Sequence, residues 1–196
     1  MENKAYHHGD LKRELMEKGL VLISRYGEDK LSLRKLAAEC GVSNAAPYAH
    51  FKNKDELLAE MQNYVMKRFA EELEKAVKEY GNSDKLFIKL GKAYVMFFYK
   101  NPLYFDFLFS RKNIEIQPSV NKSGKNEPLE ILKKTASAYF LKFGLSDREI
   151  ENKIMAMWAL VHGLSAISVM PNLELSGDFE ERAEEIISSA SALRKE

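Results

Sequence analysis

The sequence predicts an all-α protein, and three observations support that prediction. Apolar residues recur about every 3.6 positions in nearly every segment, as on one face of an amphipathic helix, and no segment alternates as a strand would. Serine, aspartate or asparagine precedes several of these segments, where its side chain can cap a helix. Glycine or proline follows most of them. About nine helices are expected, over residues 11–26, 33–39, 44–51, 53–80, 84–100, 103–109, 128–143, 147–169 and 178–193.

The first three predicted helices have distinct start and stop signals. Asp10 is expected to cap the first helix, and Gly27 follows its last residue. Ser32 is expected to cap the second helix. Gly41 stands just after that helix, where the chain needs a left-handed backbone that glycine adopts most freely. Ser43 is expected to cap the third helix.

Two later helices begin with a pair of residues spaced as in a capping box. Asn53 with Glu56, and Ser146 with Glu149, can exchange side-chain and backbone hydrogen bonds at a helix start. Residues 111–127 are polar and contain both a proline and a glycine. That composition predicts a loop between two helices.

Composition limits the classes of protein that this chain can belong to. Its 196 residues suffice for one domain, or for one domain with a small module. With 45% hydrophobic and 30% charged residues, the chain is globular rather than disordered. The single cysteine, Cys40, excludes a disulfide framework and a zinc site of several thiolates. No run of 18 apolar residues and no signal-peptide core is present, so we expect a cytoplasmic protein without a membrane partner.

The net charge of +1 does not indicate the strongly basic surface of many nucleic-acid binders. The distribution of charge is more informative. Residues 31–54 carry four basic residues and one acidic residue, so that four minus one gives a local charge of +3: Arg34, Lys35, Lys52, Lys54 and Glu39. Such a patch could meet a phosphate backbone or could be an ordinary solvated face, and charge alone favours the second interpretation.

Residues 31–58 have the spacing of a helix-turn-helix motif. A helix of about seven residues is followed by a three-residue turn with glycine and by a second short helix. The second helix of such a motif lies in the major groove of DNA, whose width admits one α-helix. From Asn44 this helix starts with small residues, which permits close approach to base edges. Pro47 lies one turn further on and removes a backbone hydrogen bond, so a tight or irregular start is expected.

The sequence LSLRKLAAECGVSNAAPYAHFKNKDELL, from Leu31 to Leu58, closely resembles the TetR (tetracycline-repressor-like) family of bacterial transcription regulators. The stretches YHHGDL, from Tyr6, and WALVHG, from Trp158, resemble a subgroup whose C-terminal domain carries a Trp-then-His-Gly motif. The resemblance implies a helix-turn-helix DNA-binding domain over residues 1–53. It also implies a helical ligand-binding and dimerisation domain over residues 54–196.

The resemblance further implies which side chains meet DNA. Ser32 would touch a phosphate, which a hydroxyl at a helix N-terminus favours. Arg34, Tyr48 and Lys54 match phosphate-binding positions of the family. Asn44 is the best candidate to read a base, since an amide can pair with adenine through two hydrogen bonds. The predicted DNA-binding residues are Ser32, Arg34, Ser43, Asn44, Ala45, Pro47, Tyr48, His50 and Lys54.

Several of these residues allow more than one interpretation. Ala45 and Pro47 could pack on a thymine methyl group, and His50 could contact a phosphate or a base edge, or be an ordinary surface histidine. Ala49 departs from many relatives, which have arginine there, so one ionic contact is absent.

Other residues near the motif have structural alternatives. Tyr48 and Phe51 could be core aromatics, and the core is favoured for Phe51. Cys40 is expected to be a small buried residue rather than a redox switch. His7 and His8 lack partners at metal-ligand spacing, and we expect them in an arm that lies near DNA.

Residues 94–109 hold eight aromatic side chains, too many for all of them to face solvent. They fill a core or line an apolar cavity, and the resemblance favours the cavity. Trp158 and His162 stand four residues apart on one helix face, and Gly163 leaves room for a ligand; a buried, hydrogen-bonded His162 is an equal alternative. The predicted ligand-binding residues are Tyr94, Phe97, Phe98, Phe105, Phe109, Trp158 and His162.

The predicted function is a ligand-responsive transcriptional repressor. The last two helices are apolar on one side, and pairing them in a homodimer, as family members do, would bury those faces. Two-fold symmetry predicts a palindromic site on double-stranded DNA, with reading helices about 34–36 Å apart. A small, largely apolar effector would favour another placement of the first and fourth helices and lower the affinity for DNA. No cofactor is expected.

Two other classes of function are alternatives. An enzyme is not expected, because four histidines and one cysteine give no spacing for a nucleophile–base pair or a metal cluster. A helical interaction or scaffold protein, whose helix-turn-helix no longer reads DNA, is compatible with the weak overall basicity.

Overall fold

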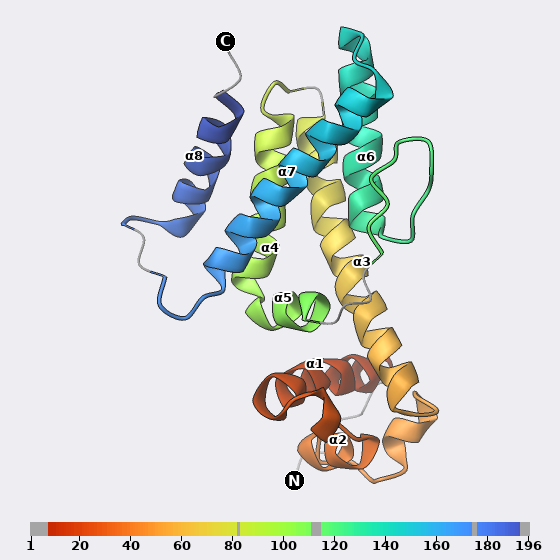
Figure 1. Ribbon diagram of the computed structural model, residues 1–196. Coiled ribbons are helices and arrows are strands. Elements are labelled where there is room, and N and C mark those ends of the chain that lie inside the picture. Colours follow the sequence, from red (N-terminus) through yellow and green to blue (C-terminus); the bar gives the residue numbers. More distant parts are fainter. Residues whose placement is uncertain (1–7, 82, 111–114, 174–175, 193–196) are drawn as a thin grey trace. The chain divides into compact units, whose positions relative to one another are not determined.

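Helices account for all the regular secondary structure of the computed structural model, which describes residues 8–81, 83–110, 115–173 and 176–192. Within these ranges there are eight α-helices and three short 3₁₀ helices, so the all-α prediction is confirmed. The elements in chain order (Figure 1) are α1 (His8–Tyr26), η1 (Glu28–Lys30), α2 (Leu33–Glu39), η2 (Ala46–Ala49), α3 (Lys54–Tyr80), α4 (Leu86–Lys100), α5 (Pro102–Phe109), α6 (Glu127–Phe140), η3 (Leu141–Phe143), α7 (Asp147–Ser168) and α8 (Phe179–Ala192).

The chain divides into two compact units. The first comprises the residues up to Val65 together with Asp106–Ser110, and the second comprises Met66–Phe105 and the residues after Ser110. This division lies inside α3, whereas the sequence places the boundary after residue 53. The reason is packing, because the side chains of the first three turns of α3, such as Met61 at 0% exposure, are buried in the core of the first unit.

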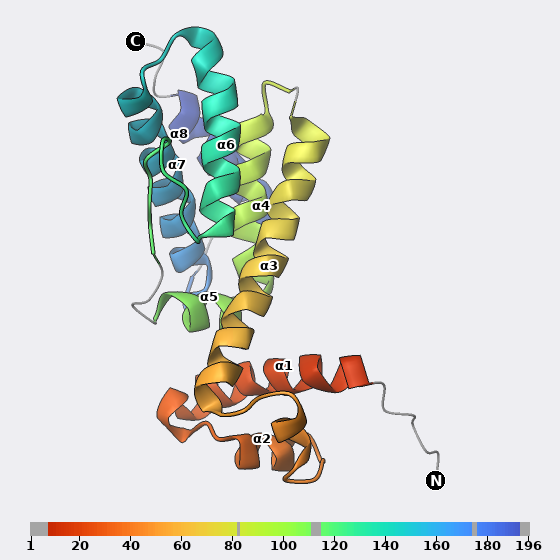
Figure 2. The ribbon, with the colours of Figure 1, turned by 90° about the vertical axis from the view of Figure 1, so that its right-hand side faces the viewer.

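The first unit contains α1, α2, η2 and the beginning of α3 (Figure 2). Leu15, Leu36 and Phe51 are among its fully buried side chains and come from three different segments. α1 begins at His8, so Asp10 lies in its first turn and does not precede it as predicted. The Ser32 cap is confirmed, since the Ser32 hydroxyl accepts a hydrogen bond of 3.1 Å from the Lys35 N–H.

The third predicted helix is the main difference between sequence and structure. In place of an α-helix over residues 44–51 there is a turn followed by η2, and no side chain caps η2, so the predicted Ser43 cap is wrong. Pro47 has no N–H to donate, and the neighbouring amides bond over three residues, from Ala46 N to Ser43 O and from Tyr48 N to Ala45 O. The predicted irregular start therefore extends over the whole segment.

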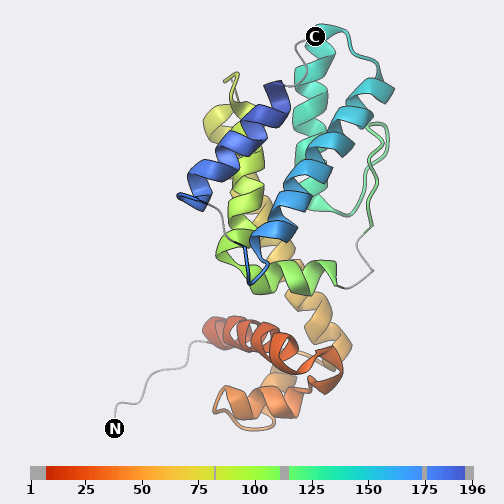
Figure 3. The ribbon, with the colours of Figure 1, turned by 60° about the vertical axis from the view of Figure 1, so that its left-hand side comes forward.

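In the second unit, α4 packs against both α7 and α8 (Figure 3). Gly91 of α4 lies where these helices meet. A Cβ atom on Gly91 would stand 3.1 Å from Val161 Cγ1 and 3.4 Å from Ile187 Cδ1. Only glycine therefore fits this spacing without a displacement of the neighbouring side chains.

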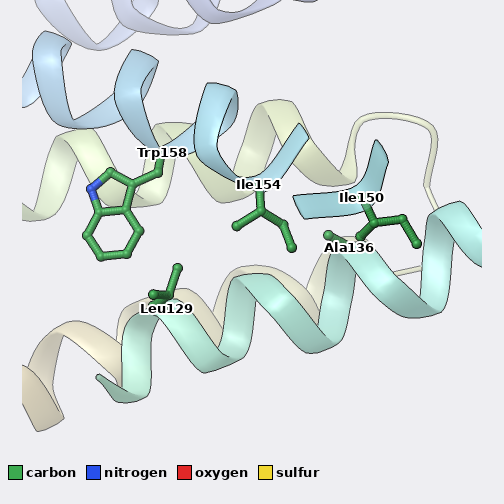
Figure 4. Close-up of a cluster of buried hydrophobic side chains, with 5 residues drawn as sticks. All are labelled: Leu129, Ala136, Ile150, Ile154 and Trp158. Carbon is green, nitrogen blue, oxygen red and sulfur yellow. The ribbon is translucent and has the colours of Figure 1, made fainter. Parts of the chain in front are cut away.

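The interface of α6 with α7 contains a second part of the core. Leu129 and Ala136 of α6 face Ile150, Ile154 and Trp158 of α7 (Figure 4). We call these five residues the α6–α7 cluster. The predicted capping box of Ser146 and Glu149 is present at the start of α7 and fixes where that helix begins.

Candidate functional sites

The segment between α2 and α3 presents small and polar side chains to solvent. Gly41, with φ of 65°, turns the chain after α2, as the sequence predicts. Ser43, Asn44 and Ala45 are exposed, and Tyr48 is 58% exposed. We call residues 43–50 the reading segment.

Buried residues anchor the reading segment. Pro47 is buried, which favours a role in packing this turn over contact with a base. Phe51 is only 1% exposed, so the core interpretation of this residue is confirmed. The half-buried His50 ring lies 6.2 Å from the Phe51 ring, between centroids. Cys40 is also buried, and burial raises the pKa of its thiol to about 11, so the thiol is un-ionised at neutral pH.

The start of α2 adds polar groups to the first unit. Ser32 and Arg34 are exposed, and the Ser32 hydroxyl already caps the helix. The Lys35 ammonium lies 3.6 Å from the centroid of the Tyr26 ring, a cation–π distance. The sequence did not single out Tyr26, because the partners are nine positions apart and on different helices.

Lys54 has a partner within the first unit. Its ammonium donates a hydrogen bond of 2.6 Å to the Glu28 carbonyl, which ties the turn after α1 to the first residue of α3. An ammonium has three N–H donors, so this bond leaves capacity for a phosphate. Lys52, two residues earlier, is exposed. Ser32, Arg34, the reading segment and Lys54 thus all belong to one compact unit, on α2, η2 and the start of α3.

Two family models match the chain. The model for bacterial regulatory proteins of the tetR family matches residues 15–61, and the model for the Tetracyclin repressor-like C-terminal domain matches residues 87–190. The chain belongs to the TetR family. The predicted subgroup motif, Trp158 followed by His162 and Gly163, stays a prediction.

Individual proteins agree with this assignment. An "Uncharacterized HTH-type transcriptional regulator" of Haemophilus influenzae is 32% identical over 117 residues, which are 60% of this chain and 61% of that protein. A solved structure from Pseudomonas aeruginosa PAO1 has a TM-score of 0.75 and 20% identity, and covers 96% of this chain and 92% of that chain. AibR, solved with isovaleryl coenzyme A and operator DNA, has a TM-score of 0.64 and 16% identity over 91% of this chain and 96% of that chain. The structural matches establish the fold, and the chain is a TetR-family transcriptional regulator.

The second unit of this TetR-family regulator holds a cluster of packed aromatic rings. Phe69 of α3 lies at its centre, with ring centroids 4.7 Å from Tyr94, 4.9 Å from Phe97 and 4.7 Å from Phe98. Phe98 in turn contacts Phe105 at 5.3 Å. The rings fill the space between one another, as in a core. Phe69 was missed in the sequence, because nothing in the pattern of α3 separates it from other inward apolar residues.

One polar contact lies within this aromatic cluster. The Tyr94 hydroxyl and His162 Nδ1 are 3.2 Å apart, and the His162 ring lies 5.3 Å from the Phe105 ring, between centroids. Burial raises the pKa of the Tyr94 hydroxyl and lowers the pKa of the His162 imidazole, so both groups are neutral near pH 7. His162 is thus half-buried and hydrogen-bonded, and the Tyr94–His162 pair is uncharged.

The structure brings together five of the seven predicted ligand-binding residues. Trp158 instead packs in the α6–α7 cluster, and Phe109 belongs to the first unit. A groove of about 710 Å³ lies between α4 and α8, but its lining is mostly charged, including Lys85, Lys92 and Glu181. It is therefore not the apolar cavity that the sequence predicts.

The outer face of α7 carries a stripe of small and apolar residues. Met155 is 42% exposed and Ile167 43% exposed, and Ala159 between them is exposed too. Gly163 continues the stripe, and apart from its chain neighbours and the nearby backbone of α7, no described atom lies within 4 Å of a Cβ atom built on it. None of the described helices is long and apolar enough to span a membrane.

Proposed function

We propose that this TetR-family regulator is a ligand-responsive repressor. It binds a palindromic operator as a homodimer and leaves DNA when a small, largely apolar effector binds. The observation that carries the proposal is the reading segment, which holds exposed Asn44 and Tyr48 on a buried anchor of Pro47 and Phe51. To read the bases of DNA, polar side chains have to be exposed and held on a rigid support, and this segment has that arrangement.

The proposed contacts follow from the chemistry of each side chain. Asn44 reads adenine through its amide, and Ala45 packs on a thymine methyl. Ser32, Arg34 and Tyr48 contact phosphates, as does the Lys54 ammonium beside its bond to Glu28. Ser43 and His50 stand at the two ends of the reading segment and complete the proposed surface. The expected arm at His7 and His8 lies outside the residues whose side chains the structure describes.

The stripe on α7 supports the proposed homodimer. Its residues, from Met155 to Ile167, recur every four positions, so they form one continuous face about 18 Å long at a rise of 1.5 Å per residue. Exposed apolar faces of this kind mark interaction sites. Pairing α7 and α8 with their copies would bury it by the same two-fold operation that makes an operator palindromic.

The aromatic cluster supports an apolar effector. Its rings offer a flat apolar ligand many contacts, and the Tyr94–His162 pair offers it one hydrogen-bonding partner. Because the rings are packed together, the effector has to displace some of them, and that displacement distinguishes two conformations. AibR, a protein of the same fold, was solved with isovaleryl coenzyme A and operator DNA, which supports the proposal that a chain of this fold binds a small molecule as well as DNA. An effector preference for one conformation, typically 1–3 kcal/mol, is then enough to lower DNA affinity.

Selection of duplexes from a random DNA pool tests the proposed function. We expect an enriched palindrome whose half-sites are about 10 base pairs apart. The variant Asn44→Ala should lose selectivity at one base pair of each half-site, whereas Asn172→Ala, a matched change at an exposed asparagine of the second unit, should not. If no sequence is enriched, the scaffold alternative is favoured instead.

A further inference from the structure

Residues 115–126, which we call the strap, are irregular in backbone and lie along α6 and α7 (Figures 1 and 2). Side chains of both helices hold the strap. The Val120 N–H donates to Glu151 Oε1 at 3.1 Å, and the Gly124 N–H donates to Glu130 Oε1 at 3.0 Å. The strap is thus attached to two helices by carboxylates.

Beneath the strap, α6 buries a lysine. Lys133 is 3% exposed, and its ammonium donates hydrogen bonds to the Lys122 carbonyl at 2.5 Å and to Glu130 at 2.7 Å. Burial opposes ionisation of Glu130, but the hydrogen bonds from Lys133 and from the Gly124 N–H hold the pKa of that carboxyl below its ordinary value. Glu130 is therefore ionised, and it joins the lysine to the strap.

Such an ion pair is an inefficient way to stabilise a fold. Apolar residues of similar volume often stabilise a protein as well or better, while loss of one partner leaves a costly unpaired charge. Breaking this pair would therefore remove the Lys133 contact with the strap and leave a buried charge beside it. We call Lys133, Glu130 and the Lys122 carbonyl the latch.

One residue of the strap packs against the edge of the α6–α7 cluster. In the part of the chain that the structure describes, this residue is Val120. Figure 4 shows the side chains of the cluster itself, among them Leu129 and Trp158. The other attachments are polar. The hydrogen bond from Asn121 to Asp147 is exposed, so water can replace it, whereas Lys133 and Asn126 are buried. Detaching the strap as far as Lys125 therefore uncovers the edge of this interface under Val120 and leaves Asn126 as the cap of α6.

We propose that the strap is a lid that opens when the latch breaks and that admits an uncharged, apolar molecule to the α6–α7 cluster. This inference rests on the proposed effector response and adds the α6–α7 cluster as a place where such a molecule enters the second unit. The molecule is uncharged because leucine, isoleucine and tryptophan offer a buried charge no partner. Lys133 is a positioning residue, since it acts through the strap.

Hydrogen exchange on the full chain tests whether the strap opens on its own. Lys133→Met keeps the length of the side chain and removes its charge, so the amides of residues 115–126 should exchange about tenfold faster or more, with α6 and α7 unchanged. Lys134→Met is the matched control, because Lys134 is exposed and next in sequence. This variant should change the exchange rates of neither the strap nor the two helices. Glu130→Gln, which keeps an acceptor for Gly124, should give a smaller increase in the strap alone. Equal acceleration in strap and helices, or none, overturns the proposal.

Admission of a ligand is tested with N-phenyl-1-naphthylamine, an uncharged fluorescent probe. Trp158 is the chain's single tryptophan and lies in the α6–α7 cluster, so energy transfer from it reports arrival of the probe in the second unit. The association rate should rise in Lys133→Met and Glu130→Gln in the order of their strap exchange, and should stay unchanged in Lys134→Met. A probe rate that is the same in all variants, despite faster strap exchange, contradicts the lid.

Operator binding separates this inference from the proposed function. All the variants should bind the selected palindrome as the native chain does when no ligand is present. If the native chain selects no palindrome, the proposed function is wrong, and the exchange and probe results still show whether the strap acts as a lid. If the palindrome is selected and the probe rates do not differ, only the lid fails.

Discussion

Tyr48 in the first unit and Tyr94 in the second are the same type of residue in opposite surroundings. Tyr48 is 58% exposed, whereas Tyr94 is 8% exposed and touches Phe69 and His162. In the first unit the residues proposed to contact DNA are exposed and stand on buried residues. They can therefore be substituted without disturbing the core. In the second unit the residues proposed to contact the effector are buried in the aromatic cluster. A substitution of one of them therefore alters both the stability of the fold and the binding of the effector. Substitutions in the two units test this difference.

The largest expected effect is on stability. Phe98→Ala should lower the free energy of unfolding by about 3–5 kcal/mol, because a side chain at 0% exposure would leave a cavity among packed rings. Tyr48→Ala should change it by less than about 0.5 kcal/mol. Urea unfolding of both variants measures these values. Similar losses at the two positions would remove the contrast between the units.

A smaller effect is expected on base recognition. Asn44→Ala should weaken binding to the selected operator by about 1–3 kcal/mol, since the variant has no amide to pair with a base in each half-site. Binding to operators substituted at each position should show relaxed preference at one base pair. A uniform loss over all sequences would instead assign Asn44 to the phosphate backbone.

The salt dependence of binding sharpens the roles of two neighbouring lysines. Lys54→Ala should reduce the slope of log affinity against log salt by about 0.9 for each phosphate that the protein no longer neutralises, whereas Lys52→Ala should change it less. Both variants lack one positive charge, so an equal change in slope would indicate a general field rather than a direct phosphate interaction at Lys54. A weaker affinity with an unchanged slope would indicate that Lys54 acts only through its bond to Glu28.

The smallest effect concerns pH. Burial lowers the pKa of the His162 imidazole from 6.5, so the unfolded chain binds this proton more readily than the folded chain. The His162 contribution is therefore fully present above pH 6.5 and is lost as the pH falls from there through the folded-state pKa. His162→Gln should flatten the stability profile in that window. Glu184, whose pKa is lowered by hydrogen bonds from Lys89 and Lys92, loses its contribution only below pH 4.5, so the two effects separate.

Local features of this fold were predictable from the sequence. The caps at Ser32 and at Ser146 with Glu149 depend on residues three positions apart, and both are present. An α-helix was predicted over residues 44–51, where the structure has a turn followed by a 3₁₀ helix. The apolar periodicity of a sequence does not show that Pro47 lacks an N–H donor and thereby changes the hydrogen bonds of the residues around it.

Features that depend on distant neighbours were not predictable. Trp158 and His162 are four residues apart on α7, yet Trp158 packs against α6 while His162 contacts rings of α4 and α5. Residues on the same broad face of α7 therefore pack against different helices. The spacing of residues in the sequence does not show which neighbour each of them contacts. In the sequence nothing distinguishes Lys133 from an exposed lysine. Its burial becomes apparent only in the structure, where the Lys122 carbonyl of the strap accepts a hydrogen bond from its ammonium.

Gly91 of α4 lies against both carboxy-terminal helices, α7 and α8, so a substitution at this one position affects the packing of both. Its missing side chain sets the separation of α4 from Val161 on α7 and from Ile187 on α8 at the same time. Adding a single methyl group would push on both helices at once, and in the proposed dimer these two helices carry the contacts between subunits. The rate of subunit exchange could thus be tuned by a substitution that never touches the partner.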